Sequence, residues 1–199
     1  MQTLKREMEE DEVLRLVDFI LANSPRNVGD IKAIFFAAGS AWKVGTRAGE
    51  VGLERRVQEG VADAADLVIA SSASAGALLA EAWHQVFGRD PNPEEAYSKA
   101  IKAVEEAGAH IVLPDNPKAT LGTMLNTMAP QGWGVPLEEA AAHPSNDVAV
   151  KMARALWSGQ KSRHGGNDYR KPTMEEAEAA VLLAVPLVQW FTSGVLARR

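Results

Sequence analysis

Apolar residues recur at helical spacing along most of the N-terminal half of the chain. Over residues 9–23 they form one stripe, which Ser24-Pro25 should end because the residue before proline disfavours the helical conformation. A shorter apolar stretch covers 30–38 and stops at Gly39. Residues 53–87 are rich in Ala and Leu, and a serine cluster near 71–76 should interrupt them. These patterns predict helices throughout this half.

The second half carries clearer start signals. Asn92-Pro93 combines a capping residue with proline at the first helical position, and two acidic residues follow that favour the helix dipole. The helix that begins there should end at Gly108. Further helices are predicted over 120–128 and 144–158. Thr173-Met-Glu-Glu176 is a capping box that opens the last helix, in which Pro186 predicts a kink.

Only one run resembles a strand, and Pro114 cuts it short. It covers 110–114, and a single fragment of this kind cannot form a sheet. The pattern therefore predicts an all-α protein, a helical bundle. A division near 88–92 would separate an N-terminal helical region, 1–90, whose role the sequence does not indicate, from a C-terminal domain over 91–199.

The composition is that of a soluble globular protein. The chain has 199 residues, of which 46% are hydrophobic and 24% charged. It has no cysteine, which excludes disulfide scaffolds, Cys-ligated metal sites and thiol nucleophiles. The longest apolar run, 179–191, is shorter than the roughly 20 residues that span a bilayer. The acidic, amphipathic N-terminus does not resemble a secretory signal, so we expect a cytoplasmic protein without a membrane partner.

The net charge of −5 is unevenly distributed. Residues 151–199 hold eight basic and four acidic residues, a balance of +4, whereas the rest of the chain holds 13 basic and 22 acidic residues, a balance of −9. A basic quarter on an acidic body indicates an anionic partner for that quarter, although a solvated surface with chance asymmetry would look the same.

The chemistry-bearing residues gather in the segment 157–171, between two predicted helices. Its glycines permit close backbone approach to a ligand. His164 can exchange protons near neutral pH, and cations beside such an imidazole suit metal-free phosphodiester cleavage, in which a base deprotonates a 2′-hydroxyl. The cations that could bind phosphate are Lys161, Arg163, Arg170 and Lys171, and Gln160 or Asn167 could add polar contacts. The alternative is a solvated turn. The other histidines lie too far apart to predict a metal site, and no cofactor motif occurs.

The Arg163-His164-Gly165-Gly166 motif before a long, Thr-capped final helix resembles the C-terminal domain of bacterial abortive-infection proteins. These belong to the HEPN superfamily of small α-helical nucleotide- and RNA-binding domains. The residues around the motif are similar too, over about half the chain: 96–105, 118–123, and 173–180 running into Gln189-Trp190.

The resemblance implies an RNA-binding homodimer that cleaves RNA without metal, as a toxin or phage-defence effector, in some cases with a cognate antitoxin. His164 matches the family's histidine. The family's arginine should stand at Trp157, Ser158 or Gly159, none of which is basic, and Arg163 and Arg154 are the nearest alternatives. By this resemblance His164 is the general base or acid and Arg163 stabilises the developing charge. We expect a homodimer formed through the apolar final helices.

The alternative function is that of a non-catalytic HEPN-like binding or scaffold protein. Its basic loop would dock a partner or a nucleotide without chemistry. Loss of His164 should then leave partner affinity largely intact, whereas an enzyme should lose turnover.

Overall fold

The fold is mostly helical, with short strands. The structure, a computed structural model, describes residues 9–47, 49–137, 147–160 and 169–199. The helices are α1 (Glu10–Asn23), α2 (Val28–Ala37), α3 (Glu59–Ser71), α4 (Ala73–Phe87), α5 (Pro93–Val112), α6 (Leu121–Met128), α7 (Val148–Gly159) and α8 (Met174–Thr192), with a 3-10 turn over Pro25–Asn27. The strands are β1 (Trp42–Arg47), β2 (Glu50–Arg55), β3 (Trp133–Gly134) and β4 (Ala197–Arg198).

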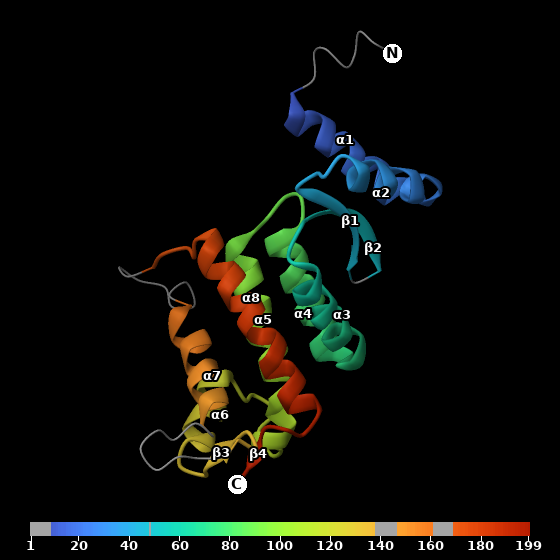
Figure 1. Cartoon of the computed structure of the whole chain (residues 1–199). Helices are drawn as coiled ribbons and strands as arrows, with labels where there is room; N and C mark the ends of the chain where they lie inside the picture. The colour runs from blue at the N-terminus through green and yellow to red at the C-terminus, as the bar shows by residue number, and fades with distance from the viewer. Residues whose placement is uncertain (1–8, 48, 138–146, 161–168) are drawn as a thin grey trace.

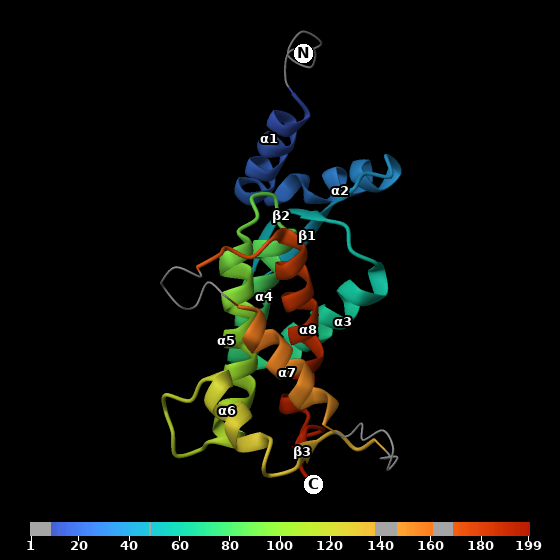
Figure 2. The same cartoon turned by 90° about the vertical axis from the view of Figure 1, so that its left-hand side faces the viewer.

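The bundle is built on α4, α5 and α8, which run side by side along the length of the molecule (Figures 1 and 2). The helix α3 covers α4 and α8, while α6 and α7 pack on the other side against α5 and α8. One hydrophobic core joins residues from α3 to the tail after α8. This core continues across residue 90, and the division near that residue stays a prediction.

The absence of a sheet was predicted wrongly. The strands β1 and β2 form an antiparallel hairpin in which Val44 faces Leu53, so residues 53–55 belong to a strand and the helix α3 begins only at Glu59. A second antiparallel pair joins β3 to β4. The helices α1 and α2 lie with the hairpin at the end of the molecule opposite β3 and β4 (Figure 1).

The run 110–112, predicted as a strand, is the last turn of α5. This helix continues past Gly108 because that glycine is a point of close packing rather than a stop. A Cβ atom there would lie 2.5 Å from Cε of Met124 and 2.9 Å from Cζ of Phe191. Val112, one turn further on, is buried in the core. Tertiary packing therefore extends the helix by four residues.

Several sequence predictions are confirmed. The caps at Asn92 and Thr173 begin α5 and α8, and a break at Ser72 separates α3 from α4. Pro186 lies inside α8, and its kink stays a prediction. The apolar face of α8 is buried in the core of its own chain, through residues such as Val181, Leu187 and Phe191. A homodimer through this helix stays a prediction. The burial of the apolar face of α8 within its own chain does not favour it.

Candidate functional site

The candidate segment connects the end of α7 to the start of α8. Four of the residues predicted to act there, Lys161, Arg163, His164 and Asn167, lie outside the described residues. Of the others, Gln160 directly follows α7, and Arg170 and Lys171 lie in the approach to α8. The described part of the site consists of the two ends of the segment and the helices that hold them.

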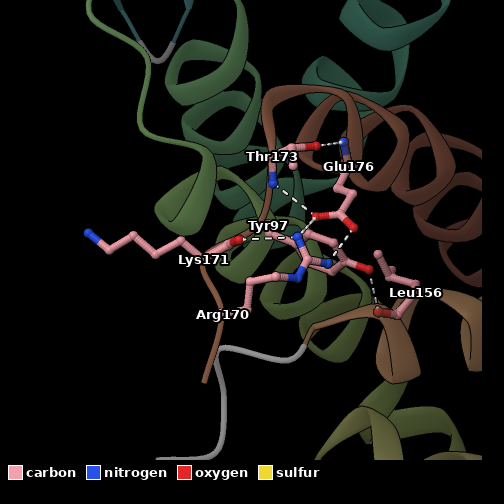
Figure 3. A network of polar contacts seen from close by, with 6 residues as sticks. All are labelled: Tyr97, Leu156, Arg170, Lys171, Thr173 and Glu176. Carbon is pink, nitrogen blue, oxygen red and sulfur yellow. Dashed lines mark hydrogen bonds and ion pairs between the residues drawn. The ribbon is translucent and has the colours of Figure 1, made fainter. Parts of the chain in front are cut away.

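The start of α8 is held by a polar network around Glu176 (Figure 3). The backbone N–H of Thr173 donates to Oε2 of Glu176 at 2.9 Å, and the N–H of Glu176 donates to Oγ1 of Thr173 at 3.2 Å. Together these bonds form the capping box that the sequence predicts, and they satisfy N–H groups that a helix terminus would otherwise leave free.

Arg170 binds the same carboxylate. Its Nη1 and Nη2 atoms donate to Oε2 and Oε1 of Glu176 at 2.9 and 2.6 Å, a bidentate pair. The hydrogen bond to Glu176 raises the pKa of Arg170, so the guanidinium stays charged. Its charge is nevertheless compensated within the chain. In this state Arg170 holds the chain at the entry into α8, and both of its terminal nitrogens are bound to Glu176 rather than to a phosphate.

Lys171 and the neighbouring Tyr169 converge on one carboxylate in the first turn of α5. The hydroxyl of Tyr169 donates to Oε1 of Glu94 at 2.8 Å, and Nζ of Lys171 lies 3.9 Å from Oε2 of Glu94. The hydrogen bond to Glu94 raises the pKa of the Tyr169 phenol. Because Lys171 is exposed and its ion pair is long, this cation can exchange Glu94 for another anion at little cost.

The other end of the segment is pinned to α5 as well. The hydroxyl of Tyr97, a residue only 5% exposed, donates to the carbonyl oxygen of Leu156 in α7 at 3.0 Å (Figure 3). A Cβ at Gly159 would overlap this hydroxyl, so the last turn of α7 lies directly on Tyr97. The ring of Trp157 packs on α6 at Gly122, where a Cβ would lie 2.7 Å from the indole Cζ2.

Both ends of the segment are thus fixed to the first two turns of α5. Glu94 holds the side leading into α8, and Tyr97 holds the end of α7. Neither residue was predicted to hold the segment, and Glu94 is one of the two acidic residues that the sequence assigns to the helix dipole of α5. No sequence signal links either residue to partners about 60 or 75 positions away, because these contacts arise from the packing of α7 and α8 on α5.

Arg154, the arginine suggested as an alternative to Arg163, is exposed on α7. It forms no ion pair with another described residue, whereas Lys151, one turn earlier, pairs with Asp147 at 2.9 Å. Arg154 is therefore a described cation near the segment whose charge no described carboxylate compensates. Among the described ranges, no cluster of three or more His, Asp or Glu side chains could hold a metal ion.

Comparison with known proteins adds no relative. No family model matches the sequence, and neither a curated protein nor a solved structure matches the chain. Within the part of the chain that the structure describes, no helix is long and apolar enough to cross a membrane.

Proposed function

We propose that the segment between α7 and α8 binds RNA and cleaves it without a metal ion. His164 removes the proton from a 2′-hydroxyl, and the 2′-oxygen attacks phosphorus. The P–O5′ bond then breaks to leave a 2′,3′-cyclic phosphate, and the departing O5′ takes a proton from water to become a 5′-hydroxyl. Arg163 stabilises the charge on the phosphorus oxygens. Lys161, Lys171, Gln160 and Asn167 position the RNA backbone. The assignment of these roles rests on the resemblance to HEPN domains.

The observation that supports this proposal most is the double anchoring of the segment on α5. Catalysis by positioned groups requires a rigid base, because small displacements of reacting groups greatly reduce the rate. The Tyr97–Leu156 hydrogen bond and the Tyr169–Glu94 hydrogen bond supply such a base at the two ends. The helix α7 precedes the segment and α8 follows it. A role in phage defence or as a toxin with a cognate antitoxin forms part of this proposal.

A second candidate is a non-catalytic HEPN-like binding protein. The observation that favours it is the pairing of the two described cations within the segment 157–171, Arg170 with Glu176 and Lys171 with Glu94. Cations that are paired with carboxylates of their own chain attract an external anion less strongly. They therefore suit a loop that binds a partner weakly through charge better than a loop that binds RNA tightly. In this alternative His164 takes no part in proton transfer.

The test is incubation of labelled single-stranded RNA with the purified protein in EDTA. We expect cleavage by the parent and none by His164→Ala or Arg163→Ala. His110→Ala is the matched control, because His110 is an exposed histidine near the opposite end of α5 and should leave cleavage unchanged. DNA of the same sequence should stay intact, since it lacks the 2′-hydroxyl.

A binding measurement on the same variants separates the two candidates. If the parent binds RNA and does not cut it, and if His164→Ala binds equally well while Arg163→Ala binds more weakly, the catalytic proposal fails and the binding role stands. Cleavage that survives in His164→Ala would refute the role of His164 directly.

A further inference from the structure

The helix α2 is strongly apolar and yet buries none of its residues. Its sequence, VGDIKAIFFA, contains one Val, two Ile and two Phe, and Ile34 and Phe36 are 64% and 77% exposed. A helix of ten residues is not stable in water through its own hydrogen bonds and usually depends on packing of its apolar face. An exposed apolar surface of this kind marks a site of association.

The neighbouring helix α1 also has an uncovered apolar side. One side is attached to the hairpin, since Leu21 is buried and Oδ1 of Asp18 accepts the N–H of Leu53 at 2.6 Å. Leu16 and Phe19, three positions apart and therefore on one side, are 48% and 65% exposed. The helices α1 and α2 lie at the same end of the molecule, away from α6 and α7 (Figures 1 and 2). We call α1 and α2 with the β1–β2 hairpin the tip.

The tip also contains a hollow of about 570 Å³ between α2, β1 and the start of α3. Its apolar lining includes Phe36, Val44 and Val57. Its charged lining residues, which we call the rim, are Lys32, Lys43, Arg56, Glu59 and Asp63, and Nζ of Lys43 also lies 3.7 Å from Oε1 of Glu54. The first turn of α1, in contrast, exposes three acids, Glu10, Asp11 and Glu12, and the exposed Glu9 precedes them. One tip therefore offers both a helix with an acidic first turn and an apolar side, and an apolar hollow whose rim carries Lys32 and Arg56.

We propose that two copies of the chain associate through their tips, with α1 of each copy lying over α2 and the hollow of the other. Such a contact is reciprocal, as a two-fold dimer requires, because the same two surfaces are used twice. It covers Phe19 and Phe36 and brings the acidic first turn of α1 to the rim that holds Lys32. An anionic membrane suits the tip less well, since the acids of α1 would be repelled from its surface.

The first test is the oligomeric state of the full chain by sedimentation equilibrium over a wide concentration range. We expect a reversible dimer whose dissociation constant rises about thirtyfold or more in Phe36→Glu and in Phe19→Glu, as for loss of a central aromatic anchor. The matched control is Leu67→Glu, because Leu67 is 72% exposed on α3 and lies outside the tip. Circular dichroism should show that these exposed positions tolerate the change without unfolding.

The second test reverses the charges. Lys32→Glu and Glu10→Lys should each weaken self-association, because each places like charges on both sides of the reciprocal contact. A mixture of the two variants should dimerise again, since each interface in the mixed dimer then pairs one acid with one base.

A parent that is monomeric at all concentrations overturns the proposal, as does equal weakening by Leu67→Glu. Failure of the mixture to recover refutes the placement of α1 on α2, and binding of a monomeric parent to anionic vesicles would assign the tip to membranes instead.

Discussion

The hydroxyl of Tyr97 on α5 lies between two features of α7, the carbonyl oxygen of Leu156, to which it donates at 3.0 Å, and the Cα of Gly159. The hydroxyl fits only because residue 159 has no side chain. The contact between α5 and α7 therefore depends on both residues together, and it sets the position from which the candidate segment departs.

Tyr97→Phe should lower the free energy of unfolding by about 1 kcal/mol, the usual contribution of such a hydrogen bond. Gly159→Ala should cost about 1–3 kcal/mol, because the new Cβ displaces the hydroxyl. Combined with Tyr97→Phe, the same alanine should cost much less, since without the hydroxyl the nearest ring atom, Cζ of residue 97, lies 3.4 Å from the new Cβ. Urea denaturation of the parent, the two single variants and the double variant measures the coupling. Additive effects would contradict the geometry.

A buried carboxylate joins the hairpin to the core. Oε1 of Glu54 accepts the indole N–H of Trp83 at 2.7 Å and lies 3.7 Å from Nζ of Lys43. Glu54→Ala should destabilise the fold by about 3 kcal/mol, because it removes one partner of a buried polar cluster. Glu54→Gln keeps an acceptor for the indole and should cost less. Glu50→Ala, an exposed residue of the same strand, should change thermal or urea stability by about 0.5 kcal/mol at most.

The stability of the fold should depend on pH through Glu105. Burial raises the pKa of this carboxyl, although the N–H of Leu121, which donates to Oε1 at 2.6 Å, acts in the opposite direction. The folded state therefore holds the proton to higher pH than the unfolded state. The free energy of unfolding contributed by this group is highest below the unfolded pKa, near 4.5, and falls as the pH rises through the folded value.

Glu105→Gln should remove this dependence. The variant should be more stable than the parent at neutral pH, and the difference should shrink as the pH falls through the folded pKa and vanish below the unfolded pKa. Denaturation of both proteins across this range measures the effect. Glu106→Gln, an exposed neighbour on α5, is the control. An equal response of the two variants would mean that burial of Glu105 is not the cause.

If the chain binds RNA as proposed, Arg154 and Arg170 should contribute differently. Arg154 has no described ion-pair partner, whereas both oxygens of Glu176 bind Arg170. Arg154→Ala should reduce the slope of log affinity against log salt by about 0.7, the loss of one phosphate contact on a single strand. Arg170→Ala should leave the slope nearly unchanged and lower the melting temperature. Fluorescence titration at several salt concentrations measures both. The opposite ranking would show that Arg170 leaves Glu176 to bind phosphate.

The elements that the sequence predicted well are those whose ends carry their own signals. Asn92 and Thr173 begin helices through bonds made within four residues, so local pattern is sufficient. The hairpin was missed because Gly45 and Gly52 weaken the strand pattern. In the fold Gly45 is required, since a Cβ there would overlap the carboxylate of Glu54. The prediction that α5 ends at Gly108 was wrong for a similar reason. This residue is a glycine because the side chains of Met124 and Phe191 pack directly against its backbone.

The composition of residues 157–171 was sufficient to predict the candidate segment. It did not predict the residues of α5 that hold the two ends of the segment. Charge and glycine content are visible in a single stretch of sequence. The contacts of Glu94 with Tyr169 and of Tyr97 with Leu156 join positions far apart in the chain, and they exist only once α7 and α8 lie against α5. Sequence alone could therefore name residues in the loop but could not distinguish Arg170, which pairs with Glu176, from Arg154, which pairs with no described carboxylate.

The central place of α8 has a consequence for the chain during its synthesis. The helices α4 and α5 can pair early, but the face of α5 that receives α8 stays uncovered until α8 is made, because α5 ends at Val112 and α8 begins at Met174. At roughly 5–20 residues per second, these roughly 60 residues take about 3–12 seconds to translate. For that interval the nascent chain presents an apolar surface to the cell, and it is the period in which a chaperone would matter most.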